Sequence, residues 1–271
     1  MAVSHTESHT GARLAAGWRI QRRVIAALMI RELTTRFGRE NIGFLWVMAE
    51  PLLFATLVGL LWRIMHGVSE HGINVFAFVA TGYLPMVLFR NAVNRSVGLF
   101  QANASLMYHR QILIQDFVLV RFCVECIGHM MAYLFIGVVM VALGLFPMPY
   151  DLALMLAGWA VYGWFTLAMC CLLAPLSELS PVLEKVMPVS VYLMVPFSGA
   201  FTMAAWLAPG ARALLLCSPP VHGMEMMRAG LFGPAHQAYY ALFYPLAVSG
   251  AIMAVGLWLC RQVRRHLVVE A

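Results

Sequence analysis

Long apolar runs separated by short polar connections dominate the pattern along this chain. A run of about 20 apolar residues is long enough to cross ~30 Å of hydrocarbon as an α-helix. The pattern predicts six such helices, at residues 43–62, 73–94, 122–146, 152–175, 186–206 and 241–260. Polar residues fill the connections 95–121 and 176–185. The short turn at 147–151 predicts that the helices on either side of it are antiparallel neighbours.

Residues 207–240 do not fit this pattern. They are too apolar for an ordinary loop, yet Pro209-Gly210, Pro219-Pro220 and Gly233-Pro234 interrupt them. Helical pieces of about eight and twelve residues reach only ~12–18 Å. Non-helical backbone at membrane depth needs burial in protein or a water-filled cavity. We therefore expect two short re-entrant helices, near 210–217 and 221–231. The alternative is a broken seventh span.

The chain before the first apolar run is polar and then basic. Residues 1–16 are expected to be disordered, and residues 17–40 to form a basic, loosely amphipathic interface helix. Such a helix lies on an anionic cytoplasmic leaflet; the alternative is a solvated run of charges. The last residues, 266–271, are expected to be a cytoplasmic tail.

Composition agrees with a membrane protein. The chain is 62% hydrophobic and only 11% charged, whereas soluble domains carry about 25% charged residues. The pattern of a cleavable signal peptide is absent. We predict one all-α polytopic membrane domain over 17–265.

The basic residues predict its orientation, because Lys and Arg gather on the cytoplasmic side. With both termini in the cytoplasm, all but Arg63, Arg212 and Arg228 of the 18 Lys and Arg residues fall on that side.

Motifs for catalysis or nucleotide binding are missing. A P-loop needs a Gly-rich turn followed by Lys and Ser or Thr, and the only lysine, Lys185, has no glycine around it. No HExxH or GxSxG pattern occurs either. The chain is therefore expected to bind no cofactor, and any ATP and Mg²⁺ must be held by a partner subunit.

Two polar pairs lie within the third predicted span. Cys123-x-x-Cys126 places two thiols one helical turn apart, as a redox or metal pair or as small packing residues. Packing is favoured, because no second pair with zinc spacing accompanies them. His129 follows Glu125 by one turn, and packing is favoured over a proton relay, which needs a longer chain of such groups.

Glu50 is the most specific single candidate for a functional residue. A carboxylate about seven residues into a helix lies ~10 Å from the interface, and such groups face a partner or a cavity. Arg90 is a plausible partner. Glu50 is either a gate or substrate-path residue or half of a static ion pair. Trp46, Tyr83, Tyr192 and Phe201 are aromatic candidates for a sugar path; the alternative is a membrane-interface belt.

Residues 31–51 resemble the permeases of ABC-2 type polysaccharide exporters. The match consists of Arg31-Glu32-Leu33, Thr35-Arg36-Phe37-Gly38, Gly43, Leu45-Trp46 and Glu50-Pro51. The chain is most similar to the inner-membrane permease of group 2 capsular polysaccharide export. That similarity rests on Gln101-Ala102-Asn103, Tyr108-His109-Arg110, Pro188, Pro219-Pro220-Val221-His222-Gly223-Met224-Glu225 and Arg228. Ser218-Pro219 stands where the family typically has Asn-Pro.

The resemblance implies the ABC-2 (type V) exporter fold in the bacterial inner membrane. It implies a homodimer that binds two cytoplasmic ABC ATPase subunits. The cargo would be a lipid-linked, often anionic capsular polysaccharide, which passes to a periplasmic adaptor and an outer-membrane exporter. No nucleic-acid partner is expected.

The resemblance also suggests roles for individual residues. Substrate-path or lipid-terminus contacts are expected at Arg31, Arg36, Arg39, Trp46, Glu50, Tyr83, Arg90, Tyr192 and Phe201. The alternative for Arg31, Arg36 and Arg39 is that they bind phospholipid headgroups or the ATPase. Contacts with the ATPase are expected at Gln101, Tyr108, Arg110, Asp116, Glu178 and Glu184. Arg212, His222, Glu225 and Arg228 would shape the periplasmic exit.

Two other functions stay open at this point. One is an ABC-2 exporter of O-antigen, teichoic acid, another lipid-linked glycan or small drugs. The other is a membrane enzyme acting on lipid-linked sugar, for which the four polar residues between 212 and 228 supply the candidate side chains.

Overall fold

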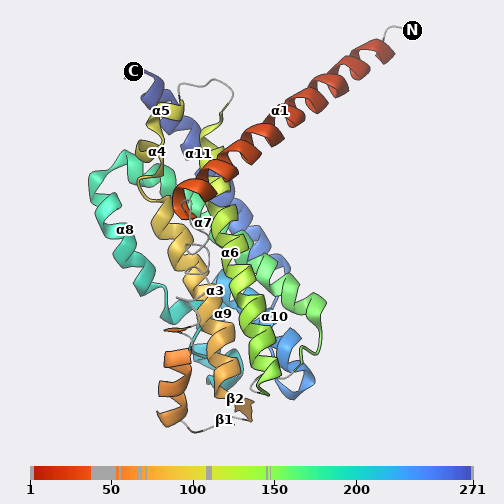
Figure 1. Cartoon of the computed structure of the whole chain (residues 1–271), viewed down its shortest axis with the longest axis vertical. Coiled ribbons are helices and arrows are strands. Elements are labelled where there is room, and N and C mark those ends of the chain that lie inside the picture. The colour runs from red at the N-terminus through yellow and green to blue at the C-terminus, as the bar shows by residue number, and fades with distance from the viewer. Residues whose placement is uncertain are drawn as a thin grey trace.

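Four long helices form the body of the molecule. The computed structural model describes residues 3–37, 53–54, 56–65, 67, 69–70, 72–107, 112–144, 146 and 148–269. Within them, α3 (Val75–Ser96), α6 (Ile114–Ala142), α7 (Leu152–Leu179) and α11 (Phe243–Val269) run along one another (Figure 1). All four are long and apolar enough to cross a membrane, α11 as far as Arg264. The prediction of an all-α multi-pass membrane protein is confirmed.

The other two expected spans differ from these four. Most of 43–62 lies outside the described residues, and Thr56–Met65 is a short apolar helix. The expected helix over 186–206 is interrupted. It begins earlier, as α8 (Pro181–Leu193), and two 3₁₀ turns follow, η1 (Pro196–Ser198) and η2 (Ala204–Trp206). Pro196 cannot donate a helical hydrogen bond, and Gly199 has φ +74, a left-handed conformation that suits glycine.

The connections are shorter and more ordered than expected. The polar residues after α3 form α4 (Leu99–Ala102) and α5 (Ala104–Met107). Only Ser180 separates α7 from α8, because Pro181 stands at the first position of α8, where its missing N–H is not needed. Two short strands, β1 (Ser69–Glu70) and β2 (Ile73–Asn74), pair as an antiparallel hairpin before α3.

The two ends of the chain are helical. The N-terminal helix α1 (Val3–Phe37) includes residues 3–16, which we expected to be disordered. Ala, Arg and Leu in this stretch favour helix, and α1 extends away from the bundle in Figure 1. The last helix, α11, continues to Val269, through most of the expected tail.

Two short helices occupy the interrupted segment before α11. They are α9 (Pro209–Leu216) and α10 (Pro219–Phe232), followed by η3 (Gly233–Ala235). Their bounds agree within two residues with the pair expected near 210–217 and 221–231. Each begins with proline, which favours the first turn of a helix. Every residue from Pro220 to Arg228 is buried, so α10 is a core helix despite its polar side chains.

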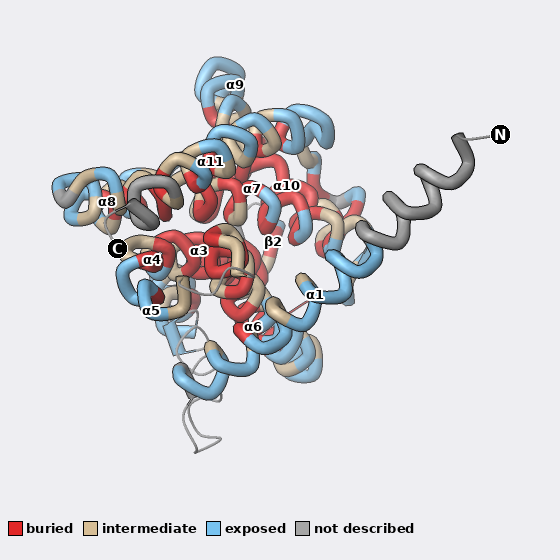
Figure 2. Tube along the Cα trace, turned by 90° about the horizontal axis from the view of Figure 1, so that it is seen from above, coloured by how far each residue is buried: buried red, intermediate tan, exposed pale blue. Residues whose placement is uncertain are grey.

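Glycines bring α10 and α11 close to α7. A Cβ at Gly158 of α7 would lie 2.6 Å from the Gly223 carbonyl oxygen of α10. One at Gly230 would lie 2.5 Å from the Met155 nitrogen, and one at Gly256 of α11 would lie 2.6 Å from the Cys171 carbonyl oxygen. Small residues permit such backbone contact between helices in membranes. In Figure 2 the buried stretches of α3, α7 and α10 meet in the middle of the bundle.

We predict that Gly158→Ala destabilises the protein by about 1–3 kcal/mol, because the added methyl group forces α10 away from α7. Gly250→Ala on α11 is the matched control, since nothing lies within 4 Å of a Cβ there. That variant should be neutral or stabilised by up to about 1 kcal/mol through helix propensity. Thermal unfolding in detergent, followed by size-exclusion chromatography, measures both. Equal melting temperatures would contradict the packing account.

Candidate functional site

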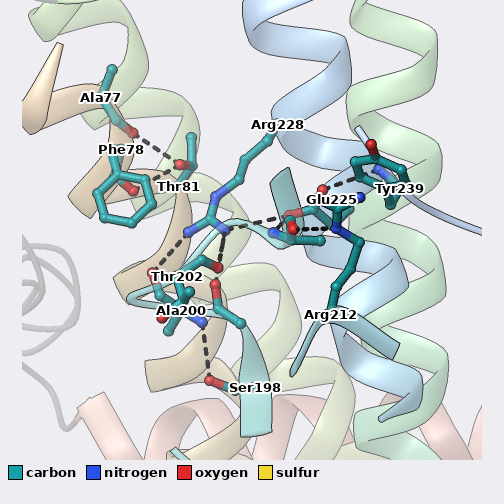
Figure 3. Close-up of polar contacts among 12 residues, drawn as sticks. Ala77, Phe78, Thr81, Ser198, Ala200, Thr202, Arg212, Glu225, Arg228 and Tyr239 are labelled. Atoms are coloured by element: carbon teal, nitrogen blue, oxygen red, sulfur yellow. Dashed lines mark hydrogen bonds and ion pairs between the residues drawn. The ribbon is translucent and has the colours of Figure 1, made fainter. Parts of the chain in front are cut away.

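Arg228 of α10 lies at the centre of a polar cluster (Figure 3). Its side chain is fully buried. Nη1 donates to the carbonyl oxygens of Gly199 at 2.8 Å and Thr202 at 3.1 Å, and Nη2 donates to Ala200 at 2.7 Å. The guanidinium also lies 4.7 Å from the centre of the Phe78 ring. One side chain therefore fixes the non-helical segment 199–202 between α10 and α3.

This arrangement needs a glycine on α3. A Cβ at Gly82 would lie 1.9 Å from the Ala200 carbonyl oxygen and 2.9 Å from Nη2 of Arg228. Burial lowers the pKa of Arg228 to about 10, and Glu225 acts in the opposite direction. The guanidinium is therefore still charged at neutral pH.

Glu225, one turn before Arg228, links three parts of the chain. Its Oε1 accepts a hydrogen bond from the Ala204 nitrogen, and its Oε2 accepts one from the Tyr239 nitrogen, both at 3.2 Å. The carboxylate lies 3.9 Å from Nη1 of Arg228. A buried carboxylate with two N–H donors and a nearby cation is well satisfied.

Arg212 of α9 also binds backbone. Its Nε donates to the Ala204 carbonyl at 2.8 Å, and its Nη2 donates to Leu207 at 3.1 Å. Its guanidinium lies 4.2 Å from the centre of the Tyr239 ring. Arg212 thus holds the turn before α9 and the segment after α10.

His222, near the start of α10, is bonded through both ring nitrogens. Nε2 lies 2.9 Å from the Leu216 carbonyl oxygen, and Nδ1 lies 3.0 Å from the Ala241 nitrogen. Burial lowers the pKa of His222, and Glu225 opposes that effect only in part. The four residues expected at the exit therefore lie together, and each is engaged with backbone.

A second group lies at the opposite end of the bundle. The Gln101 side chain of α4 lies near the Glu178 carboxylate at the end of α7. The Gly98 nitrogen donates to the Ser177 hydroxyl at 3.2 Å. A Cβ at Gly98 would lie 3.4 Å from the Glu184 carboxylate of α8. Three residues expected to contact an ATPase, Gln101, Glu178 and Glu184, thus come from three helices to one place.

The other expected ATPase contacts are not part of this group. The Asp116 side chain is 3% exposed. Its carboxylate accepts from the Leu113 nitrogen at 2.9 Å and from the Gln21 side chain of α1. Asp116 thus caps α6 and fastens α1. Tyr108 and Arg110 lie outside the described residues.

The basic helix α1 is tied to the same end of the bundle. Nη1 of Arg31 donates to the Asn103 side chain at 2.9 Å, and Glu32 forms a 2.8 Å ion pair with Arg121 of α6. Arg36 is the last residue but one of α1, and nothing is described of its side chain. Arg39, Trp46 and Glu50 lie outside the described residues.

The remaining path candidates are dispersed. Tyr83 is 6% exposed and stacks on Phe54. Phe201 stacks on Trp62 with ring centres 5.9 Å apart. Tyr192 is 59% exposed on α8. Arg90 lines a small cavity between α3, α7, α8 and the start of α10.

A buried polar network joins α3 to α6. Glu125 is fully buried and lies 3.0 Å from Nε of Arg95. His129 is also buried, with Nδ1 2.9 Å from the Glu125 carbonyl oxygen and Nε2 3.3 Å from Asn91. The sequence placed His129 beside Glu125, but Arg95 and Asn91 were missed. The sequence did contain a signal for this network. Asn91 and Arg95 are polar residues one turn apart near the end of α3, and the next long helix, α6, carries the carboxylate Glu125.

The cysteines form no disulfide bond. Cys123 and Cys126 are free and partly buried. In the part of the chain that the structure describes, no group of three His, Cys, Asp or Glu residues is arranged to hold a metal ion.

Similar proteins cover nearly the whole chain. The capsule polysaccharide export inner-membrane protein CtrC of Neisseria meningitidis serogroup B is 37% identical over 238 residues, which are 88% of this chain and 90% of that protein. The chain belongs to the family of capsule polysaccharide export inner-membrane proteins. BexB of Haemophilus influenzae, another member, is 34% identical over the same shares. The polysialic acid transport protein KpsM of Escherichia coli is 25% identical over 248 residues, 91% of this chain and 95% of that protein. No protein-family model matches the chain.

Membership confirms the resemblance drawn from the motifs at 31–51, 101–110 and 218–228. With the four apolar helices, it makes this chain a multi-pass inner-membrane protein of capsule polysaccharide export. In this capsule-export protein, residues 220–228 of the third motif lie buried in α10, and His222, Glu225 and Arg228 hold backbone segments.

We predict that Arg228→Lys lowers the stability of this family member by about 2–4 kcal/mol. A single ammonium cannot reach three carbonyls and stack on Phe78, so buried acceptors lose their partners. Arg261→Lys, at an exposed position of α11, should change stability by about 0.5 kcal/mol or less. Chemical or thermal unfolding in detergent compares the two. A loss no larger than that of the control would rule out the clamp role of Arg228.

Proposed function

We propose that the chain is the membrane permease subunit of an ATP-driven ABC exporter that moves lipid-linked capsular polysaccharide across the bacterial inner membrane. The observation that carries this proposal is the similarity, along almost the entire chain, to proteins named for capsule polysaccharide export in the inner membrane. The apolar helices supply the membrane domain that such a subunit needs.

The energy source in this proposal is a separate cytoplasmic ATPase, which holds the ATP and Mg²⁺. The sequence has no P-loop, so hydrolysis must come from a partner. The meeting of α4, the end of α7 and the start of α8 offers a docking surface. Gln101 and Lys185 are exposed there, with Glu184 partly exposed between them. Tyr108 and Arg110 extend this surface in the proposal.

The membrane arrangement proposed here has six spans, both termini in the cytoplasm, and α9 and α10 as re-entrant helices. The packing of α10 supports the last point. Its Gly230 contacts Met155 near the start of α7, and its Gly223 contacts Tyr162, seven residues further along. Helix α10 therefore runs alongside α7 for ~10 Å. Pro220 lines the same cavity as Arg90, well inside α3.

The transport path in this proposal lies between two copies of the chain. Helix α8 supports it, because it exposes an apolar side that a single copy does not cover, at Val182, Val186, Val189 and Leu193. Arg31, Arg36 and Arg39 would attract the anionic lipid terminus, and Arg90 and Glu50 would lie along the path. A periplasmic adaptor and an outer-membrane exporter complete the system.

Orientation gives the first test. Cys217 is exposed, whereas the other cysteines are buried or partly buried in apolar helices. We expect a membrane-impermeant maleimide to label Cys217 in intact spheroplasts, because the proposed re-entrant pair opens to the periplasm and Cys217, at its turn, is exposed. Cys217→Ser should remove the label. Labelling of Cys217 only in inverted vesicles would refute the proposed topology.

The ATPase contact gives the second test. The chain is reconstituted in lipid discs with an ABC ATPase from the same organism, and hydrolysis is measured with and without lipid-linked polysaccharide. Glu184→Arg should reduce cargo-stimulated hydrolysis about tenfold, equivalent to about 1.4 kcal/mol of docking free energy. Ser69→Arg, in the exposed hairpin at the other end of the molecule (Figure 1), should leave it unchanged.

Failure of the wild-type chain to bind the ATPase, or to restore capsule export in a strain that lacks its gene, would overturn the proposed function. Equal effects of the two variants would overturn only the docking surface.

A further inference from the structure

Residues 236–242 form an extended segment between η3 and α11, and α10 holds it by side chains. The Tyr239 nitrogen donates to Oε2 of Glu225 at 3.2 Å, and the Ala241 nitrogen donates to Nδ1 of His222 at 3.0 Å. Next to the segment, the Tyr244 hydroxyl of α11 donates to the Cys217 carbonyl at 2.6 Å. The backbone of segment 236–242 is thus held against the buried helix α10, although the residues Tyr240, Ala241 and Leu242 are exposed.

The partners of His222 specify its protonation. A carbonyl oxygen only accepts, so Nε2, which lies 2.9 Å from the Leu216 oxygen, carries a proton. An amide N–H only donates, so Nδ1 opposite Ala241 carries none. The imidazole is therefore neutral in this structure. A second proton, on Nδ1, would point at the Ala241 N–H and abolish that hydrogen bond.

The charged and titratable neighbours of His222 come from every element around it. They are Glu225 and Arg228 on α10, Arg212 on α9, Cys217 between the two helices, His236 and Tyr239 in the segment, Tyr244 on α11 and Tyr162 on α7.

The Leu216 carbonyl and, among the charged and titratable neighbours, the Glu225 carboxylate favour a charged imidazole. The Glu225 carboxylate has other partners as well. Its charge is already shared among the Ala204 and Tyr239 nitrogens and Arg228. The Tyr244 ring packs edge-on against the imidazole, with ring centres 5.3 Å apart. The His222 side chain is only 5% exposed. These surroundings favour the neutral ring.

We propose that His222 is a proton-operated latch, which holds segment 236–242 on α10 when neutral and releases it when protonated. Release leaves α10 in place, because Arg228 and the glycine contacts with α7 do not involve His222. The segment leads directly into α11, so its release leaves the start of this spanning helix held by the Tyr244 contact with Cys217. That the acid reaching it is periplasmic rests on the proposed function; the release itself rests only on the fold.

The direction of the pH dependence follows from the burial of His222, which lowers its pKa in the folded state. A group of this kind stabilises the fold fully above its unfolded pKa of about 6.5. The contribution is lost as the pH falls from about 6.5 toward the folded pKa, since the released state then binds the proton more tightly. The latch is therefore closed at pH 7.5, and lowering the pH to 5.0 favours its release.

Hydrogen exchange measured by mass spectrometry on the full chain in lipid discs tests this proposal. We compare peptides covering 236–242 at pH 7.5 and pH 5.0, after correction for the intrinsic exchange rate. In the wild type, exchange of this segment should rise about tenfold or more at pH 5.0, because protonation of His222 favours the released state. Peptides from α7 should not change.

Two variants identify the responsible group. His222→Gln keeps a donor for Leu216 and an acceptor for Ala241 but does not titrate in this range, so the segment should stay protected at both pH values. His236→Gln removes the other nearby imidazole and should keep the wild-type rise. A segment that stays protected at pH 5.0 in the wild type, or a rise that persists in His222→Gln, would overturn the latch.

A further measurement covers the case in which His222→Gln does not fold. Exchange of the imidazole C2 hydrogen, followed by mass spectrometry of the wild-type chain, reports the titration midpoint of His222. A midpoint below that of an unfolded histidine supports the latch, and one at or above about 6.5 refutes it.

Discussion

The close backbone contact of α10 with α7 is the constraint on which the rest of the structure depends. In a bilayer, burying apolar surface between helices gains little, because lipid tails are equally apolar, so helices associate through tight packing. Gly158, Gly223 and Gly230 remove the side chains that would keep the two backbones apart. This contact seats a helix of only 14 residues in the core. The polar contacts of His222, Glu225 and Arg228 all start from residues that it places.

With α10 held in the core, the polar side chains of α9 and α10 stabilise the non-helical segments next to them. The segments 194–208 and 236–242 are largely non-helical, and their backbone groups need partners wherever water is excluded. Arg228 and Arg212 supply donors to carbonyls, while Glu225 and His222 supply acceptors to N–H groups. The side chains of this cluster thus give non-helical backbone the hydrogen bonds that a helix forms within its own backbone. A buried charge satisfied in this way is costly to remove, because the groups around it lose their partners.

Much of the fold follows from the sequence because its signals are local. Apolar runs located α3, α6, α7 and α11, and prolines located the starts of α9 and α10. The helix expected over 186–206 ends early, because composition alone does not register the effect of Pro196 and Gly199. The expected loop 176–185 is helical on both sides of Ser180, since polar residues at a helix end look like a loop.

The candidate sites were predictable as segments but not as contacts. The segment 212–228 was recognised as a unit, and its four polar residues do lie together. The sequence suggested an exit, however, because it does not reveal that their partners are backbone groups far along the chain. For the same reason, the sequence proposed Asp116 as an ATPase contact but did not reveal that its carboxylate caps α6. Arg95 and Glu125 are 30 positions apart and meet only through the packing of α3 on α6.

The contrast between α10 and α8 also bears on how this family can diverge. No residue larger than glycine fits at 158, 223 or 230 without moving a backbone, whereas the exposed positions of α8 accept any apolar side chain of suitable size. Apolar substitutions at Val182, Val186, Val189 and Leu193 of α8 therefore leave the packing within one copy intact, whereas a larger side chain along the α7–α10 contact moves a backbone. In this chain, Gly223, Arg228 and Gly230, at spacings of five and two residues, are positions of α10 at which a substitution moves a backbone or strips buried carbonyls of their donor.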